Sequence, residues 1–223
     1  MLNHQPAITL TFHGVGPTSR SLAPGERDCW LDRDVFESVL DLVCSFPNAK
    51  LTFDDGNASD IAVALPLLQE RKLTAAFFIC SERLHIPGFL DCDGVKHLNE
   101  CGMSVGSHGV RHVPWRGLDA AALDHELQRS RQTFEEILRL PVEAAACPFG
   151  AYDRSVLKGL RRAEYRTVYT SDGGISYPSQ WVQARTTVRR TSRLPELRHL
   201  LLAGPSAVAV LAARLRSFLK RLR

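Results

Sequence analysis

The stretch LTFDDGNASD, residues 51–60, places two adjacent carboxylates, Asp54 and Asp55, directly after a short apolar run. Like charges repel, and burying both costs free energy unless a positive group lies near them. A strand followed by an ordinary Asp-Gly turn is the simpler interpretation. The alternative is that the strand end turns both side chains toward one cavity, where a divalent cation relieves the repulsion.

Short apolar runs like this one alternate with longer amphipathic runs along the chain. They predict strands at residues 7–13, 50–53, 74–80, 103–107, 142–147 and 166–171, with a less regular one at 182–188. The amphipathic runs predict helices at 32–46, 59–72, 94–102, 119–140 and 153–165. This alternation is typical of βα units around a mostly parallel sheet. A barrel and a doubly wound sheet both fit the pattern.

The composition is that of an ordinary globular domain, with 223 residues, 44% hydrophobic, 23% charged and a net charge of +4. That charge is too small to indicate a nucleic-acid partner. The six cysteines form no C-x-x-C pair, which argues against a cysteine zinc site. The N-terminus lacks the pattern of a secretory signal, and no run has the length of a membrane span. We therefore expect a reducing, cytoplasmic location.

Polar residues gather where the predicted strands end. His13 ends the first strand, Asp54 and Asp55 the second, and Ser107-His108 the fourth, while Cys147 and Ser171-Asp172 follow the fifth and sixth. The carboxyl ends of parallel strands share one edge of the sheet, which is where active sites of α/β proteins lie. The sequence therefore predicts an active site at this edge.

His108 and His112 are spaced as i and i+4. On one face of a helical turn, two imidazoles at this spacing can reach one ion, although two polar histidines in a loop would look the same. Two histidines with one carboxylate leave coordination positions open for water and substrate, which indicates catalysis rather than structure.

Two weaker signals have structural alternatives. The segment 147–152, CPFGAY, could be a plain Pro-Gly turn, or the backbone N–H near Phe149 could face an oxyanion with Phe149 or Tyr152 walling a sugar site. His13 could be structural, or it could enter the same pocket as Asp54.

Together, the segments 52–56 (TFDDG), 108–112 (HGVRH) and 148–150 (PFG) resemble the motifs of the polysaccharide deacetylase family, carbohydrate esterase family four with the NodB homology domain. The likeness runs from about residue 7 to about residue 190. It implies an α/β fold, a distorted (β/α) barrel with about seven parallel strands. We expect a catalytic domain at 1–190 and a C-terminal helical extension at 191–223. The implied reaction is metal-dependent hydrolysis of an acetyl group on a sugar, N-acetyl before O-acetyl.

The resemblance also implies the residue roles. Asp54 is expected to be the general base, and Asp55, His108 and His112 the ligands of one divalent ion. Zinc is the first choice for that ion, with nickel, cobalt and manganese as alternatives. The backbone N–H of Phe149 would help to hold the oxyanion.

The sequence departs from the family pattern in two places. The third motif usually opens with an arginine that orients the base, and Cys147 stands there instead. The late Leu-x-His motif that supplies the general acid is not visible, and His199 lies in a helix-like run. Residues 11–15, TFHGV, resemble a branch that includes poly-N-acetylglucosamine deacetylases, in which the acid comes from the first strand. We therefore predict His13 as general acid, with Asp172 orienting a neighbouring group.

The missing arginine favours an alternative, a carbohydrate-binding pseudo-enzyme of the same fold. A further alternative concerns residues 206–223, an amphipathic helix with a basic face. This helix could pack on the barrel, or it could lie on an anionic membrane surface at the inner face of the membrane. A third hypothesis is a basic lipid- or nucleic-acid-associated module that binds through this tail.

Overall fold

The computed structural model describes residues 6–18 and 20–222, and its strands form a near-closed parallel barrel. Within that range the sheet has eight strands in the order β7-β6-β5-β4-β3-β2-β1-β8. All neighbouring pairs run parallel, which confirms the predicted barrel. The strands are β1 (Ile8–Phe12), β2 (Ala49–Asp55), β3 (Ala75–Ile79), β4 (Ser104–Ser107), β5 (Ala144–Ala146), β6 (Thr167–Thr170), β7 (Val182–Ala184) and β8 (Thr186–Thr187).

One short stretch closes the barrel. The strands β7 and β8 are separated by Arg185 alone; β7 pairs with β6, and β8 pairs with β1. Residues 182–187 therefore join the two edges of the sheet. The strand predicted at 182–188 is this seam, and its break at Arg185 is why eight strands are observed where seven were predicted.

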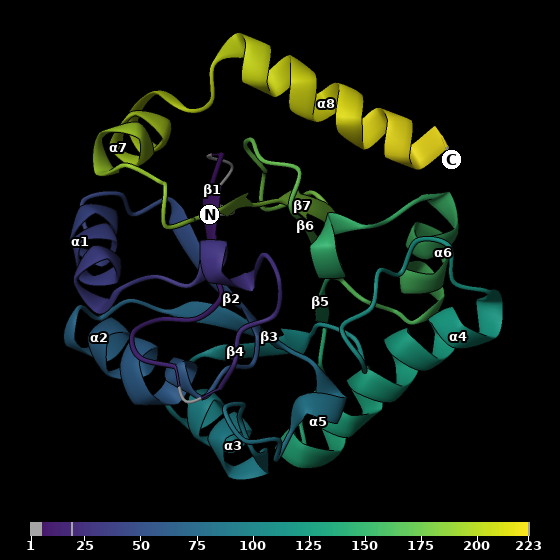
Figure 1. Cartoon of the computed structure of the whole chain (residues 1–223). Helices are drawn as coiled ribbons and strands as arrows, with labels where there is room; N and C mark the ends of the chain where they lie inside the picture. Colours follow the sequence, from purple (N-terminus) through teal and green to yellow (C-terminus); the bar gives the residue numbers. More distant parts are fainter. Residues whose placement is uncertain (1–5, 19, 223) are drawn as a thin grey trace.

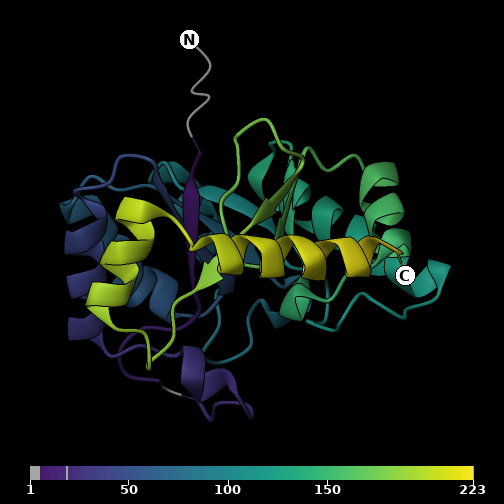
Figure 2. The same ribbon diagram turned by 90° about the horizontal axis from the view of Figure 1, so that it is seen from above.

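The five predicted helices are present and surround the strands (Figure 1). They are α1 (Arg33–Val43), α2 (Leu65–Glu70), α3 (Cys92–Glu100), α4 (Ala120–Asp124) continuing through a π-helical turn into α5 (Ser130–Leu138), and α6 (Arg154–Arg162). Two more, α7 (Leu194–Ala203) and α8 (Ala207–Leu222), cover the remaining side, with α7 against α1 and α8 against α6. Seen from above, α8 runs across the barrel wall (Figure 2).

Local signals fix several helix ends. The Asp153 carboxylate accepts a hydrogen bond of 2.9 Å from the Val156 N–H and caps α6. Gly102 follows α3 with φ 78°, the left-handed conformation that glycine adopts readily after a helix. Ser59 precedes the π-helical turn at Asp60–Ala64 without capping it, and its hydroxyl accepts from the Val15 N–H at 3.3 Å.

A ladder of phenylalanines forms the core between the strands and α1. Phe12, Phe53 and Phe77 lie in register on β1, β2 and β3, with ring centroids 5.2 and 4.6 Å apart. Phe36 of α1 packs edge-on against Phe12 at 5.1 Å. Side chains alternate along a strand, so Thr52 and Asp54 point to the other side, into the barrel.

We expect Phe53→Ala to destabilise the fold by about 3–5 kcal/mol, because it leaves a cavity in the middle of the aromatic ladder. Urea unfolding followed by circular dichroism measures this loss. Leu140→Ala, at a side chain that is 50% exposed, is the matched control and should change stability by less than about 0.5 kcal/mol. Equal losses in the two variants would contradict the proposed core.

Candidate metal and active site

The backbone at the end of β2 brings both adjacent carboxylates into one cavity. Asp54 lies on the barrel side of the strand, and alternation alone would turn Asp55 outward. Asp55 has φ 84°, a left-handed conformation rare for a residue with a side chain, and Gly56 follows with φ 73°. The turn places one oxygen of each carboxylate 3.8 Å from the His108 Nε2. The backbone at the strand end thus turns both carboxylates toward the same cavity, as the sequence predicted.

Asp55, His108 and His112 form a group that could hold a metal ion. Their ligand atoms lie within 4.8 Å of one another. The His108 Nδ1 lies 2.8 Å from the Ala146 carbonyl oxygen, so it donates there and leaves the Nε2 lone pair facing the carboxylates. The structure therefore brings together the three residues predicted as ligands.

The chemistry of this group fits a divalent cation. The buried Asp55 Oδ1 has no hydrogen-bond partner among the described residues, although His112 Nε2 lies 3.0 Å away. Burial would raise the pKa of Asp55, but the charges of His112 and the groups around it hold that pKa below its ordinary value. Burial lowers the pKa of His112 to about 4, and it lowers the pKa of His108 as well. An ionised carboxylate with two neutral imidazoles is a donor set typical of zinc and similar ions.

Arg83 makes a competing contact with two of these residues. Its Nη1 lies 3.2 Å from the Asp55 Oδ1, and its Nη2 lies 3.0 Å from the His112 Nδ1. An arginine only donates, so this Nδ1 accepts and the ring proton of a neutral His112 is on Nε2. Metal ligation through Nε2 needs that proton on Nδ1, and Arg83 then has to give up the contact.

Arg185, at the barrel seam, holds the predicted base. Its two terminal nitrogens each donate to an Asp54 oxygen at 2.7 Å, and its side chain is fully buried. Burial would raise the pKa of Asp54, but the charges of Arg185 and His108 hold it far below its ordinary range. Asp54 is therefore ionised, and its plane is fixed by the bidentate pair.

Sequence reasoning missed Arg185. The resemblance placed an orienting arginine at Cys147, which is a buried thiol whose pKa burial raises to about 12. Arg185 supplies that contact from the break between β7 and β8, and it removes the argument for a pseudo-enzyme that rested on the missing arginine. The available signal was a charged residue in the middle of a stretch predicted as a strand.

His13, the predicted acid, lies at the same end of the barrel as Asp54 and Asp55. It follows β1 directly, and its charge lowers the pKa values of both Asp54 and Asp55. Its Nδ1 is buried without a hydrogen-bond partner in the described part of the chain. The imidazole is therefore near enough to act electrostatically on both carboxylates, and its Nδ1 is free of protein hydrogen bonds among the described residues.

The loop that carries His108 and His112 is held by a residue that the sequence did not single out. The fully buried Glu126 accepts from the backbone N–H groups of Val110 at 2.7 Å and Arg111 at 3.2 Å. A Cβ at Gly109 would lie 2.7 Å from the Glu126 Oε2, and the backbone there has φ 84°. Glu126 therefore positions the loop, a role that an acidic residue in an amphipathic helix does not reveal.

The three remaining predicted site residues divide into two places. The Phe149 ring lies 4.5 Å from the His112 ring, centroid to centroid, and is 66% exposed, so it forms an open wall of the site. Tyr152 is buried, and its hydroxyl donates to the Asp172 Oδ2 at 2.6 Å. The Lys220 Nζ of α8 donates to the other Asp172 oxygen at 2.6 Å.

Tyr152 and Asp172 therefore anchor α8 in this structure. Within the described ranges, neither makes a hydrogen bond or ion pair with the predicted catalytic and metal-binding residues, which are His13, Asp54, Asp55, His108 and His112. Their contact with substrate, expected from the sequence, stays a prediction.

The sequence profile of the family Polysaccharide deacetylase matches residues 46–168, more than half of the chain. The chain belongs to the polysaccharide deacetylase family. The matched part of this deacetylase-family chain contains Asp54, Asp55, His108 and His112, whereas His13 and Arg185 lie outside it.

Relatives of this family member agree with that assignment. YxkH of Bacillus subtilis, assigned to the polysaccharide deacetylases, is 24% identical over 139 residues, which are 62% of this chain and 50% of YxkH. The chain thus spans about half the length of this curated relative. The deacetylase PplD of Streptococcus pyogenes, solved with acetate, has a TM-score of 0.75 at 19% identity, covering 87% of this chain and 97% of PplD. IcaB of Ammonifex degensii has a TM-score of 0.71 at 20% identity, with coverage of 95% and 99%. These likenesses support the fold.

We expect Arg185→Met to move the acidic limb of the kcat/KM profile to higher pH. With Arg185, Asp54 stays ionised at any pH above its lowered pKa; without it, burial dominates and the carboxyl takes up a proton at higher pH. At neutral pH the variant should also lose about 3–5 kcal/mol of stability, because a buried charge is left unpaired. pH-rate profiles and urea unfolding measure the two effects.

The double variant Asp54→Asn/Arg185→Met is the control for this stability loss. It removes one buried charge along with the other, so it should be more stable at neutral pH than Arg185→Met alone. If the double variant unfolds as easily as the single one, the ion pair is not the cause.

We expect Arg83→Met to tighten divalent metal binding about tenfold, about 1.4 kcal/mol, because it removes a cation beside a metal-binding carboxylate and frees the His112 Nδ1. Calorimetric titration with zinc measures the affinity. Arg71→Met, which breaks an ion pair with Asp41, is the control and should leave the affinity unchanged. Weaker zinc binding by Arg83→Met would show that Arg83 supports the site instead.

Proposed function

We propose that this chain is a metal-dependent hydrolase that removes an acetyl group, N-acetyl in preference to O-acetyl, from a sugar of a polysaccharide or its precursor. The observation that carries the proposal is the group of buried Asp55, buried His108 and partly buried His112 beside an ionised Asp54. Family membership supports the same reaction class. The exposed Phe149 at the edge of the site supports an extended substrate that approaches from solvent.

The proposed reaction uses a bound metal ion, a base and an oxyanion donor. A bound divalent ion, zinc first and nickel, cobalt or manganese as alternatives, supplies polarisation of the acetyl carbonyl and an acidified water. Asp54, aligned by Arg185, accepts the proton of the attacking water. The backbone N–H of Phe149 donates to the developing oxyanion, while its ring contacts the sugar.

The preference for an amide substrate rests on His13. An amine is a poor leaving group until it is protonated, so cleavage of an N-acetyl bond needs an acid as well as a base. His13, near Asp54 and Asp55, is the residue we assign to this proton. Acetate, which PplD binds in its solved structure, is the acid that such a reaction releases.

We also propose a cytoplasmic location. All six cysteines are free thiols, which suits a reducing cytoplasm. An acetylated carbohydrate is the proposed partner, and we expect no nucleic acid, given the small net charge of +4.

We expect Asp54→Asn to keep its metal and lose at least about a hundredfold in acetate release, because the amide cannot accept the proton of the water. His108→Ala should lose both metal and turnover, because it removes a ligand. The measurements are acetate release from a panel of N- and O-acetylated sugars, with and without added zinc, and metal content by mass spectrometry.

His97→Ala is the control, since His97 lies on α3 and takes no part in the metal group. It should match the parent in both readings. Acetate release by Asp54→Asn at the parental rate would remove Asp54 as the base, and release that is insensitive to chelation would remove the metal.

A further inference from the structure

The helix α8 turns its polar face toward the barrel and its apolar face to solvent. On the inner face, Ala213 is buried, Ser217 lies 3.0 Å from the Tyr152 hydroxyl, and Lys220 binds Asp172. The large apolar side chains are exposed, and Phe218 among them also lines the cavity beside α8 that is described below. Their exposed fractions are 78% for Val208, 69% for Leu211, 55% for Leu215, 57% for Phe218, 46% for Leu219 and 64% for Leu222.

These exposed side chains form one continuous stripe. Val208, Leu211, Leu215, Phe218 and Leu222 follow one another at intervals of three and four residues, which places them on one side of a helix. Contiguous apolar surface of this kind marks a site of interaction with a protein or a membrane. Hydrolysis of a sugar amide gives no reason for it.

Positive charge borders the stripe. Arg214 and Arg221, seven residues apart, share one side of α8, and the helix has no acidic residue. Residues 191–223 hold seven of the chain's 28 Lys and Arg residues but only one of its 24 Asp and Glu residues. A second copy of the same helix would bring these charges together, so the charge distribution disfavours self-association. An apolar stripe with basic margins fits anionic phospholipid.

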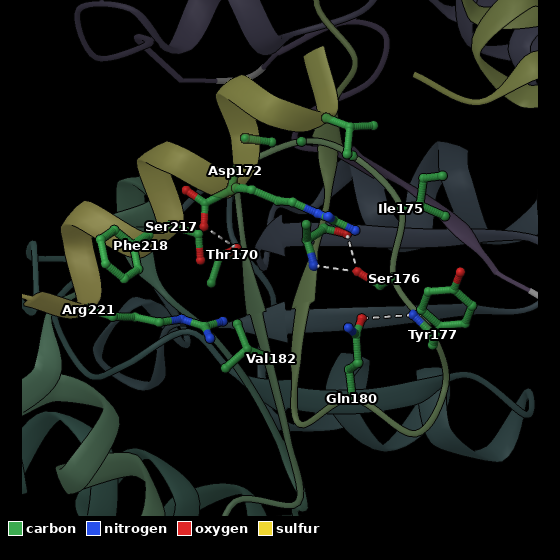
Figure 3. A pocket seen from close by; sticks show the side chains of 16 residues that line it. Thr170, Asp172, Ile175, Ser176, Tyr177, Gln180, Val182, Ser217, Phe218 and Arg221 are labelled. Atoms are coloured by element: carbon green, nitrogen blue, oxygen red, sulfur yellow. Dashed lines mark hydrogen bonds between the residues drawn. The ribbon is translucent and has the colours of Figure 1, made fainter. Parts of the chain in front are cut away.

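A cavity beside α8 is lined by the same two arginines, Arg214 and Arg221. It has a volume of 340 Å³ and lies between α8 and the segment that joins β6 to β7 (Figure 3). Arg221 reaches from α8 toward Val182 across this cavity, and Arg214 also lines it. Within residues 6–18 and 20–222, these two guanidinium groups make no hydrogen bond or ion pair. They are therefore available to the phosphate of a lipid headgroup.

We propose that the outer face of α8 binds an anionic phospholipid surface, with its apolar stripe in the acyl boundary and Arg214 and Arg221 on the phosphates. The Lys220 Nζ donates to the Gly150 carbonyl oxygen at 2.9 Å, next to Phe149 at the metal group. Docking on α8 therefore brings the active site beside the membrane surface. This inference stands apart from the proposed reaction.

The proposal places α8 along the membrane surface. No single helix in the described part of the chain is long and apolar enough to span a membrane. The pair of Leu194–Ala203 and Val208–Leu222 meets that test only when taken together, and the two are bent by 82° at their junction.

The test is flotation of the full chain with vesicles of phosphatidylcholine containing about 30% phosphatidylglycerol. The parent should float with these vesicles, and binding should fall with added salt or with pure phosphatidylcholine. Leu211→Ser/Leu215→Ser should lower the partition coefficient at least about tenfold, because it removes two leucines that the proposal buries in the acyl boundary of the membrane. Arg214→Gln/Arg221→Gln should lower it only on anionic vesicles.

The matched control is Ile86→Ser/Leu140→Ser, which alters two side chains that are 46% and 50% exposed and lie outside α8. It should bind like the parent, and so should Asp54→Asn, because lipid binding does not need turnover. The inference is overturned if the parent stays unbound on anionic vesicles, or if the α8 leucine variant floats like the parent. It is also overturned if light scattering finds a dimer that the leucine variant dissociates, because a second copy then covers the stripe.

Discussion

The buried ion pair between Arg185 and Asp54 is the contact on which both the barrel and its site depend. Two charges without access to water cost several kcal/mol each unless they pair with good geometry, and here both Asp54 oxygens accept at 2.7 Å. The two residues are 131 positions apart in the chain, so the pair also ties the closing segment to β2. The same contact keeps Asp54 ionised and sets the direction of its lone pairs. The segment that closes the sheet therefore also supplies the group that ionises and orients Asp54.

Left-handed backbone at three positions gives the site its shape. Asp55, His112 and Phe149 have φ values of 84°, 58° and 56°, and each belongs to a different loop at the same end of the barrel. Such conformations cost about 1–3 kcal/mol each for residues with side chains and persist where the surroundings hold them. Glu126 does this for the histidine loop through hydrogen bonds to the backbone. The position of the ligands therefore depends on buried groups that never touch the substrate.

Sequence patterns were sufficient for the parts of the molecule that local chemistry determines. The period of the apolar residues predicted the strands and the first five helices, and the end of β2 predicted the meeting of Asp54 with Asp55. Arg185 and Glu126 were not predicted, because their partners are distant in sequence. Arg185 stood out only as a charge inside a predicted strand, and Glu126 looked like any acidic residue of an amphipathic helix. The orientation of α8 also escaped prediction. Helical periodicity separates two faces, but only the tertiary structure shows that Ser217 and Lys220 are the ones that meet the barrel.

The seam at residues 182–187 has a consequence for how the chain reaches its native form. Until this stretch has been synthesised, β1 and β6 each present an unpaired edge, the kind of surface on which other chains assemble. The acidic doublet on β2 meanwhile has no counter-charge from Arg185. Pairing across such a long separation is slow, because a large loop must close before any contact forms. The nascent protein is therefore most prone to aggregation before residues 182–187 have been made, and a chaperone that shields open sheet edges would matter most during that interval.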